Sequence, residues 1–135
     1  MTTPTSVQDY MAANLVTLRP DMDIVEAMRL LVERRISGAP VVDLQGNLVG
    51  VLSEQDCLKL ALEAGYHEQW GGRVSETMSG EVRTVESESS ILDAARLFVE
   101  GHYRRFPVVK DGRLVGQLSR RDVLRALLAL AQSRG

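Results

Sequence analysis

Two short motifs in the chain carry residue types that suit the binding of an anion and a sugar. They are Gly50-x-x-Ser53-x-x-Asp56 and Gly116-x-x-Ser119-x-x-Asp122. If each motif lies where a strand passes into a helix, the free N–H groups of the first helical turn favour an anion there. The serine adds a hydroxyl donor for a phosphate oxygen. The aspartate carboxylate can accept hydrogen bonds from both hydroxyl groups of a ribose 2′,3′-diol.

A purely structural interpretation of these motifs also exists. Ser-x-x-Asp spacing is close to that of a helix capping box, in which both side chains only satisfy backbone donors. One copy alone would favour the structural interpretation. Two copies at matching positions favour ligand binding.

The matching positions belong to an internal repeat, which a self-comparison of the chain detects. A shift of 67 residues aligns Pro40-Val41-Val42 with Pro107-Val108-Val109, and a one-residue gap in the next turn aligns Leu48-Val49-Gly50 with Leu114-Val115-Gly116. We therefore divide the chain into a first repeat (7–63), a linker (64–73) and a second repeat (74–131).

Both repeats show the same order of predicted elements. After a short helical turn, at 6–9 or 74–78, each has a strand that holds Thr17 or Thr84, a helix, two strands and a last helix that starts after Ser53 or Ser119. The predicted helices are 24–35 and 91–100, and the strands are 39–43, 48–52, 106–110 and 114–118. Asp111-Gly112 is a strong hairpin signal. The order strand, helix, strand, strand, helix indicates an α+β fold.

Two repeats of this size need a shared core, so we expect their sheets to pack on each other. In 24–32 only Glu26 and Arg29 are polar, and in 123–131 only Arg125 is polar. Helices that are apolar nearly all round must be covered on more than one side. We therefore predict a homodimer through helix faces; the alternative is burial of these helices within one chain.

Composition excludes several classes of protein. The chain has 135 residues and 44% hydrophobic residues, which is typical of a folded globular chain. Its longest nearly apolar stretch, 126–131, is far shorter than the roughly 20 residues that cross a bilayer, and the polar N-terminus lacks a signal-peptide core. We expect a cytoplasmic protein without membrane contact.

The single cysteine, Cys57, is expected to fill space, and His67 and His102 lack neighbours at metal-ligand spacing.

The segments 37–42 with 50–56, and 104–109 with 116–122, resemble the tandem cystathionine beta-synthase (CBS) domain pair, or Bateman module. The resemblance covers about Val7 to Ala131. It implies two β-α-β-β-α units related by a pseudo-two-fold axis, with the sheets packed on each other and the helices outside. It further implies two clefts that bind adenosine-containing ligands such as AMP, ADP, ATP or S-adenosylmethionine, and regulation in place of catalysis.

The same resemblance implies which residues form the sites. Thr84 would join Ser53 and Asp56, and Thr17 would join Ser119 and Asp122, although a β-branched residue also simply suits a strand. The base would lie against residues 36–39 or 103–106. The candidate nucleotide-binding residues are Thr17, Ser37, Gly38, Ala39, Pro40, Ser53, Asp56, Thr84, Arg104, Arg105, Phe106, Pro107, Ser119, Arg120, Arg121 and Asp122.

Charge distinguishes the two predicted sites. The net charge of −2 argues against a dedicated nucleic-acid binder, yet residues 1–67 have 5 Lys and Arg against 9 Asp and Glu, whereas 68–135 have 11 against 9. Beside the second motif stand Arg104, Arg105, Arg120 and Arg121; the equivalent places in the first repeat are Ser37, Gly38, Glu54 and Gln55. Because arginine forks suit phosphate, we expect the phosphates at the second site. The resemblance implies that Arg105 is best placed for them, because similar family members carry a basic residue there. The alternative is that several of these arginines are solvated surface charges.

The sequence thus predicts a non-catalytic sensor that binds an adenine nucleotide as a regulatory ligand, needs no cofactor or metal, and signals to a separate effector protein. The alternative is an interaction or scaffold protein of the same fold that binds no ligand.

Overall fold

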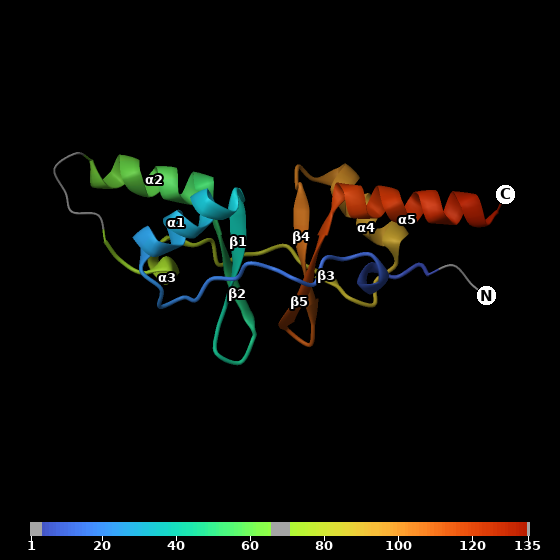
Figure 1. Ribbon diagram of the computed structural model, residues 1–135, viewed down its shortest axis with the longest axis horizontal. Coiled ribbons are helices and arrows are strands. Elements are labelled where there is room, and N and C mark those ends of the chain that lie inside the picture. The colour runs from blue at the N-terminus through green and yellow to red at the C-terminus, as the bar shows by residue number, and fades with distance from the viewer. Residues whose placement is uncertain (1–3, 66–70, 135) are drawn as a thin grey trace. The chain divides into compact units, whose positions relative to one another are not determined.

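The computed structural model describes residues 4–65 and 71–134. The elements are η1 (Val7–Asp9), α1 (Ile24–Arg34), β1 (Gly38–Val42), β2 (Leu48–Ser53), α2 (Glu54–Ala64), α3 (Val74–Thr77), β3 (Val85–Glu86), α4 (Ile91–Glu100), β4 (Arg105–Lys110), β5 (Arg113–Ser119) and α5 (Arg120–Ser133) (Figure 1). Small sheets and helices confirm the predicted α+β class. His67, and with it half of the linker, lies outside the described residues.

The chain forms two compact units that do not coincide with the sequence repeats. One unit, here the N-unit, comprises residues 16–82, and the other, the C-unit, comprises 1–15 with 83–135. The helical turn that opens each repeat therefore packs with the body of the other repeat. We call residues 4–12 and 73–79 the first and second exchanged segments. Val7 in the first and Val74 in the second are fully buried.

The N-unit is built on the β1–β2 hairpin, whose antiparallel register runs from Gly38 opposite Ser53 to Val42 opposite Leu48. Asp23 caps α1, since its carboxylate accepts hydrogen bonds from the Val25 and Glu26 N–H groups. The helix places one apolar face on the hairpin. The buried core consists of Leu18, Ile24, Ala27, Leu31, Ala39, Val41, Leu52, Cys57 and Val74.

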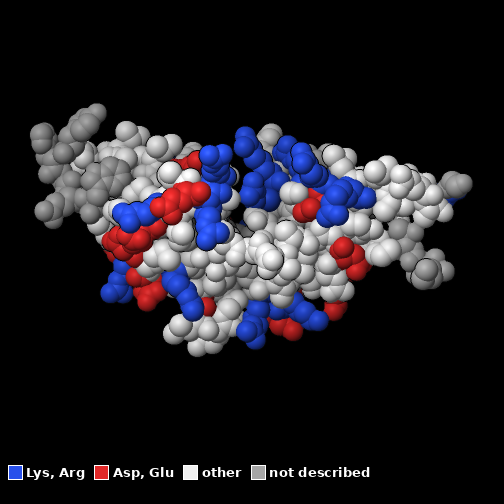
Figure 2. Space-filling model, in the orientation of Figure 1, with Lys and Arg blue, Asp and Glu red and all other residues white. Residues whose placement is uncertain are grey.

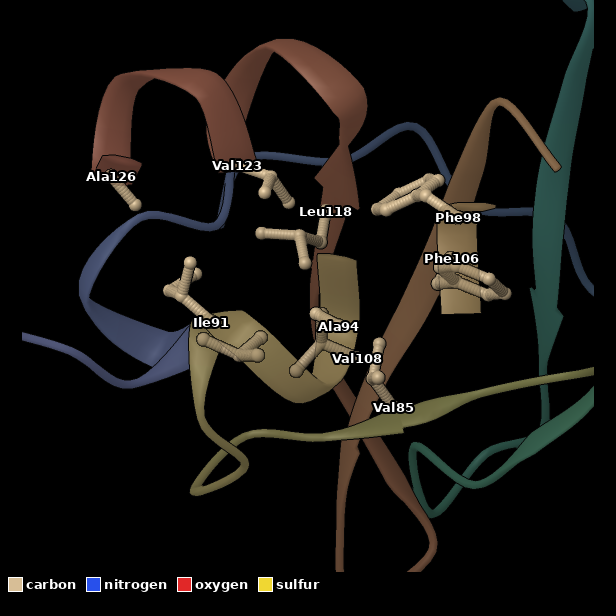
Figure 3. Packing of buried hydrophobic residues seen from close by; sticks show 10 residues of the cluster. Val85, Ile91, Ala94, Phe98, Phe106, Val108, Leu118, Val123 and Ala126 are labelled. Atoms are coloured by element: carbon tan, nitrogen blue, oxygen red, sulfur yellow. The ribbon is translucent and has the colours of Figure 1, made fainter. Parts of the chain in front are cut away.

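The C-unit contains a three-stranded sheet in the order β3-β4-β5, with β3 parallel and β5 antiparallel to β4. Figure 3 shows side chains of α4 and α5 directed toward strand residues such as Val108 and Leu118. The rings of Phe98 and Phe106 lie 4.6 Å apart between centroids. This tilted aromatic pair joins α4 to the sheet.

Several predicted boundaries need correction. Thr17 and Thr84 do not lie in strands: Thr17 precedes Leu18, which forms only an isolated bridge to Val41, and Thr84 directly precedes β3, which begins at Val85. The helix predicted over 24–35 ends at Arg34, because Arg35 turns into the left-handed region (φ 55°) and caps it. The strands start or end one residue away from their predicted limits, so that both motif serines are last strand residues.

Each unit leaves apolar side chains of its helices exposed at equivalent positions. On α1 and α4 these are Val25, Val32, Leu92 and Val99; on α2 and α5 they are Leu58, Leu62, Leu124 and Leu128. Val32 and Leu62, for example, are 76% and 84% exposed. The alternative that the helices are fully buried within one chain is therefore wrong for these faces.

Candidate functional site

Both Ser-x-x-Asp motifs lie at strand-to-helix junctions, as predicted, and both form the capping box. The Ser53 N–H donates to Asp56 Oδ2 at 2.9 Å, and the Asp56 N–H donates to Ser53 Oγ at 3.1 Å. At the second motif the corresponding distances are 2.9 and 3.2 Å. The structural role of the motif is therefore present in both repeats.

Capping leaves each carboxylate able to bind more donors. Asp56 Oδ1 accepts a hydrogen bond from Ser79 Oγ at 3.2 Å, and Asp122 Oδ1 accepts one from Arg125 Nη2 at 3.1 Å. A carboxylate offers about four acceptor positions, so about two remain on each aspartate. Two acceptor positions match the two hydroxyl groups of a ribose diol. The structural and ligand-binding interpretations are thus compatible.

Sheet register brings Arg105 to the second motif. Arg105 opens β4 directly opposite Ser119, which closes β5, whereas Gly38 lies opposite Ser53 in the other hairpin. Cβ atoms of such opposed residues lie about 5 Å apart. The exposed residue Arg105 is therefore the cross-strand neighbour of the second serine, whereas the first serine lies opposite a glycine, which has no side chain.

The other arginines extend this charge over the start of α5. Figure 2 shows Lys and Arg side chains gathered over the part of the C-unit where β4 and α5 begin. Arg104, Arg120 and Arg121 are all exposed. Arg120 Nε donates to the Tyr103 carbonyl oxygen at 3.1 Å, which holds the loop before β4 against the helix start. The equivalent residues of the first repeat, Ser37, Glu54 and Gln55, are exposed and carry no positive charge.

Each segment predicted to contact the base, 36–39 and 103–106, has its last residue in the core and its other three residues half-buried or exposed. Ala39 and Phe106 are 2% and 0% exposed, and Pro40 and Pro107 are buried. The loop residue Tyr103 is 45% exposed, and its ring lies tilted against that of Phe106 with a centroid separation of 4.9 Å. A cavity of about 260 Å³ opens beside this pair, lined by Arg83, Leu97, Glu100, Gly101, Tyr103 and Phe106. Arg83 and Glu100 were not among the predicted site residues.

The two threonines belong to different units from the motifs to which the resemblance assigns them. Thr84 precedes β3 in the C-unit, together with Ser119 and Asp122, and Thr17 lies in the N-unit with Ser53 and Asp56. Thr17 is exposed and Thr84 is half-buried. Their assignment across the repeats stays a prediction.

Ser79 and Arg125 contact the motif aspartates but were missed in the sequence. The repeat alignment gave no signal, because Ala12 stands where the other repeat has Ser79 and Lys59 stands where it has Arg125. Only the structure shows that both supply a donor to the same carboxylate oxygen.

Cys57 lies in the core of the N-unit, as expected for a space-filling residue. Burial, with smaller contributions from the nearby Asp56 and Glu54 carboxylates, raises the pKa of its thiol. A thiol held in its protonated form is a poor nucleophile. Within residues 4–65 and 71–134, no three His, Cys, Asp or Glu side chains are grouped as metal ligands would be.

A tandem of two α+β units, each presenting a capped Ser-x-x-Asp motif after a Pro-containing hairpin, defines the class of fold, and sequence comparison identifies the family. The family model of the CBS domain matches residues 7–63 and 74–129. The chain belongs to the CBS domain family, as a tandem CBS pair.

Known relatives span several kingdoms. "CBS domain-containing protein CBSX2, chloroplastic" from Arabidopsis thaliana is 32% identical to this chain. The match includes 93% of this chain and 64% of that relative. The chain therefore spans less than two thirds of that relative's length. YhcV of Bacillus subtilis, a CBS domain-containing protein, is 33% identical, with 87% of this chain and 82% of the relative covered.

Solved structures show the same fold. The crystal structure of CBSX2 in complex with AMP matches with a TM-score of 0.79 at 34% identity, covering 95% of this chain and 99% of that one. The CBS domain pair of protein MJ0100, in complex with 5′-methylthioadenosine and S-adenosyl-L-methionine, matches with a TM-score of 0.73 at 26% identity. That match covers 91% of this chain and 99% of the MJ0100 chain. No helix in the described part of the chain has the length and apolar character to cross a bilayer.

Proposed function

We propose that this CBS pair is a non-catalytic regulatory module that binds AMP, ADP, ATP or a related adenosine ligand and signals to a separate protein. The observation that carries the proposal is the pair of motif aspartates. Each takes part in a capping box at a strand-to-helix junction, and its carboxylate still has acceptor positions for a diol. The AMP complex of a 34% identical CBS pair supports the same class of ligand.

The second motif is the proposed phosphate-bearing site. Arg105 stands opposite Ser119, and Arg104, Arg120 and Arg121 surround the start of α5. Guanidinium groups bind phosphate oxygens through two parallel hydrogen bonds. The equivalent positions beside the first motif hold no arginine. The first motif therefore binds the nucleotide more weakly, prefers a less charged nucleoside group, or stays empty.

The signal would arise from differential affinity. A ligand shifts the module only to the extent that it binds one arrangement of the chain better than another. We further propose that the working unit is a cytoplasmic homodimer, in which a second copy covers the exposed leucine and valine faces of the helices.

A thermal-shift panel tests the ligand class. We expect AMP, ADP or ATP to raise Tm, because a ligand at about 100 times its Kd stabilises the native state by about 2.7 kcal/mol. The panel should include GTP, S-adenosylmethionine and 2′-deoxy-AMP. Loss of the shift with the deoxy sugar would support the contact between aspartate and diol.

The double variant Asp56→Asn/Asp122→Asn is the matched control for this panel. The asparagine oxygen can still accept the capping N–H, but the amide group replaces one acceptor oxygen with a donor. We expect the variant to fold and to lose the nucleotide shift. No shift of the wild-type chain with any adenosine ligand would contradict the proposal and favour the scaffold alternative.

A further inference from the structure

Each motif aspartate is connected to the exchanged segment of its own unit. In the N-unit, Ser79 of the second exchanged segment donates to Asp56 Oδ1 at 3.2 Å. In the C-unit, Arg125 Nη2 donates both to Asp122 Oδ1 at 3.1 Å and to the carbonyl oxygen of Tyr10, in the first exchanged segment, at 2.9 Å. The same carboxylate oxygen is engaged in both units.

Backbone pairing brings the exchanged segments to the strands that carry the motifs. Ser79 and Val51 exchange two N–H to carbonyl hydrogen bonds of 3.0 Å, and Ala12 and Gln117 exchange two of 2.9 Å. Val51 and Gln117 each stand two residues before the motif serine. A movement of either exchanged segment therefore acts on the backbone of the motif as well as on its carboxylate.

The donors to the aspartate Oδ1 atoms differ in type between the two units. The donor is a serine hydroxyl in the N-unit and a guanidinium in the C-unit. In the repeat alignment Ala12 is equivalent to Ser79, and Lys59 is equivalent to Arg125. Asp122 is held in a mostly buried place, since its side chain is only 17% exposed. The equivalent oxygen, Oδ1, thus accepts a hydrogen bond in both units although the donors are chemically different. This indicates that each carboxylate needs a donor at Oδ1 to fix its orientation.

We propose that Ser79 and Arg125 are positioning residues that couple ligand binding to the docking of the exchanged segments. The proposal rests on the proposed function. By holding Oδ1, each residue directs the remaining acceptor positions of the carboxylate toward the diol. Because energetic coupling between two binding events is reciprocal, a bound nucleotide tightens the segment to the same degree as the docked segment tightens the nucleotide.

The test measures AMP affinity by calorimetry and the amide exchange of Ala12 and Gln117 by NMR. In Arg125→Ala we expect AMP affinity to fall about fivefold, at the lower end of typical couplings. We expect the two amides to exchange faster without ligand, and AMP to slow them less than in the wild-type chain. Lys59→Ala, at the equivalent exposed position of the first repeat, should change neither measurement.

The chain itself supplies a rescue variant. Ala12→Ser places a hydroxyl where Ser79 stands in the other repeat, so Arg125→Ala/Ala12→Ser should regain most of the lost affinity and amide protection. This restores a donor without restoring the charge. Failure of the rescue would show that Arg125 acts through charge alone and would overturn the inference.

Two further outcomes separate this inference from the proposed function. If the wild-type chain binds AMP and Arg125→Ala binds it equally well, the inference is wrong and the proposed function stands. If the wild-type chain binds no adenosine ligand, the proposed function is wrong and the coupling fails with it.

Discussion

Ser87 shows how a single side chain can reduce stability. It is 2% exposed, and its hydroxyl is the one buried side-chain polar atom without a hydrogen-bond partner in the described part of the chain. An unsatisfied buried hydroxyl costs about 1–3 kcal/mol. We expect Ser87→Ala to raise the free energy of unfolding by about 1 kcal/mol, measured by urea denaturation.

Ser90 supplies the matched control for Ser87. Its hydroxyl caps α4 by accepting a hydrogen bond from the Asp93 N–H at 3.1 Å. Ser90→Ala should lower the free energy of unfolding by about 1 kcal/mol. If both alanine variants were destabilised alike, the assignment of Ser87 as an unsatisfied group would be wrong.

Cys57 allows a prediction about reactivity and pH. Its raised pKa keeps the folded-state thiol protonated where an unfolded thiol ionises, so the stability gained from the neutral thiol is complete below the unfolded pKa, declines as pH rises above it, and is lost once pH has passed the folded pKa. We expect slow reaction with a disulfide reagent at pH 8 in the folded chain and fast reaction in urea. Equal rates in both states would contradict this.

Cys57→Val should lower the free energy of unfolding by less than about 1.5 kcal/mol, because Val123 fills the equivalent position.

At the scale of elements, the two motif glycines allow the exchanged segments to dock. A Cβ added at Gly50 would lie 2.6 Å from the Met78 sulfur and 2.9 Å from the Ser79 carbonyl oxygen. At Gly116 it would meet the Met11 sulfur and lie 2.9 Å from the Ala12 carbonyl oxygen. Neither strand can approach its segment with a larger residue in place.

We therefore expect Gly50→Ala and Gly116→Ala each to cost about 1–3 kcal/mol, the usual effect of overpacking. Gly80→Ala is the control, because an added Cβ there meets no atom within 4 Å. Thermal unfolding of the three variants measures the difference. A Gly116→Ala chain as stable as Gly80→Ala would contradict the docking of the first exchanged segment.

Local signals in the sequence predicted most elements, and the spatial partners of those elements were harder to predict. Asp111 and Gly112 both adopt positive φ, 53° and 79°, as the hairpin signal required. The motif serines cap their helices, as their position implied. The exchange of the segments was not predicted. An alignment of the repeats shows which residues are alike, but it does not show whether a helical turn packs in the N-unit or in the C-unit.

The candidate site was predictable to a similar degree. Ser53, Asp56, Ser119 and Asp122 follow from spacing, and the prediction of Arg105 rested on its place before Pro107 together with the resemblance to the CBS family. Ser79 and Arg125 could not be found in this way. Each is distant in sequence from one of its partners and has a different residue type at the aligned position.

At the scale of the whole molecule, the exposed helix faces predict association. Light scattering at micromolar concentration should give the mass of two chains, because the exposed leucines on α2 and α5 lose contact with water only when another copy covers them. Leu124→Glu/Leu128→Glu should give the mass of one chain. Leu44→Glu, at an 83% exposed loop position, is the control and should leave the dimer intact. A monomeric wild-type chain would contradict the homodimer.

The placement of the phosphates at the second motif is the central claim, and calorimetric titration with AMP tests it most directly. We expect Arg105→Ala to weaken AMP binding about tenfold or more, since hydrogen bonds to charged groups contribute about 1.5–3 kcal/mol, and to leave adenosine binding unchanged. Arg113→Ala, an exposed arginine at the other end of β5, should have no effect on either ligand. Unchanged AMP and ATP affinity in Arg105→Ala, together with abolished binding in Asp56→Ala, would contradict the claim and assign the nucleotide to the first motif.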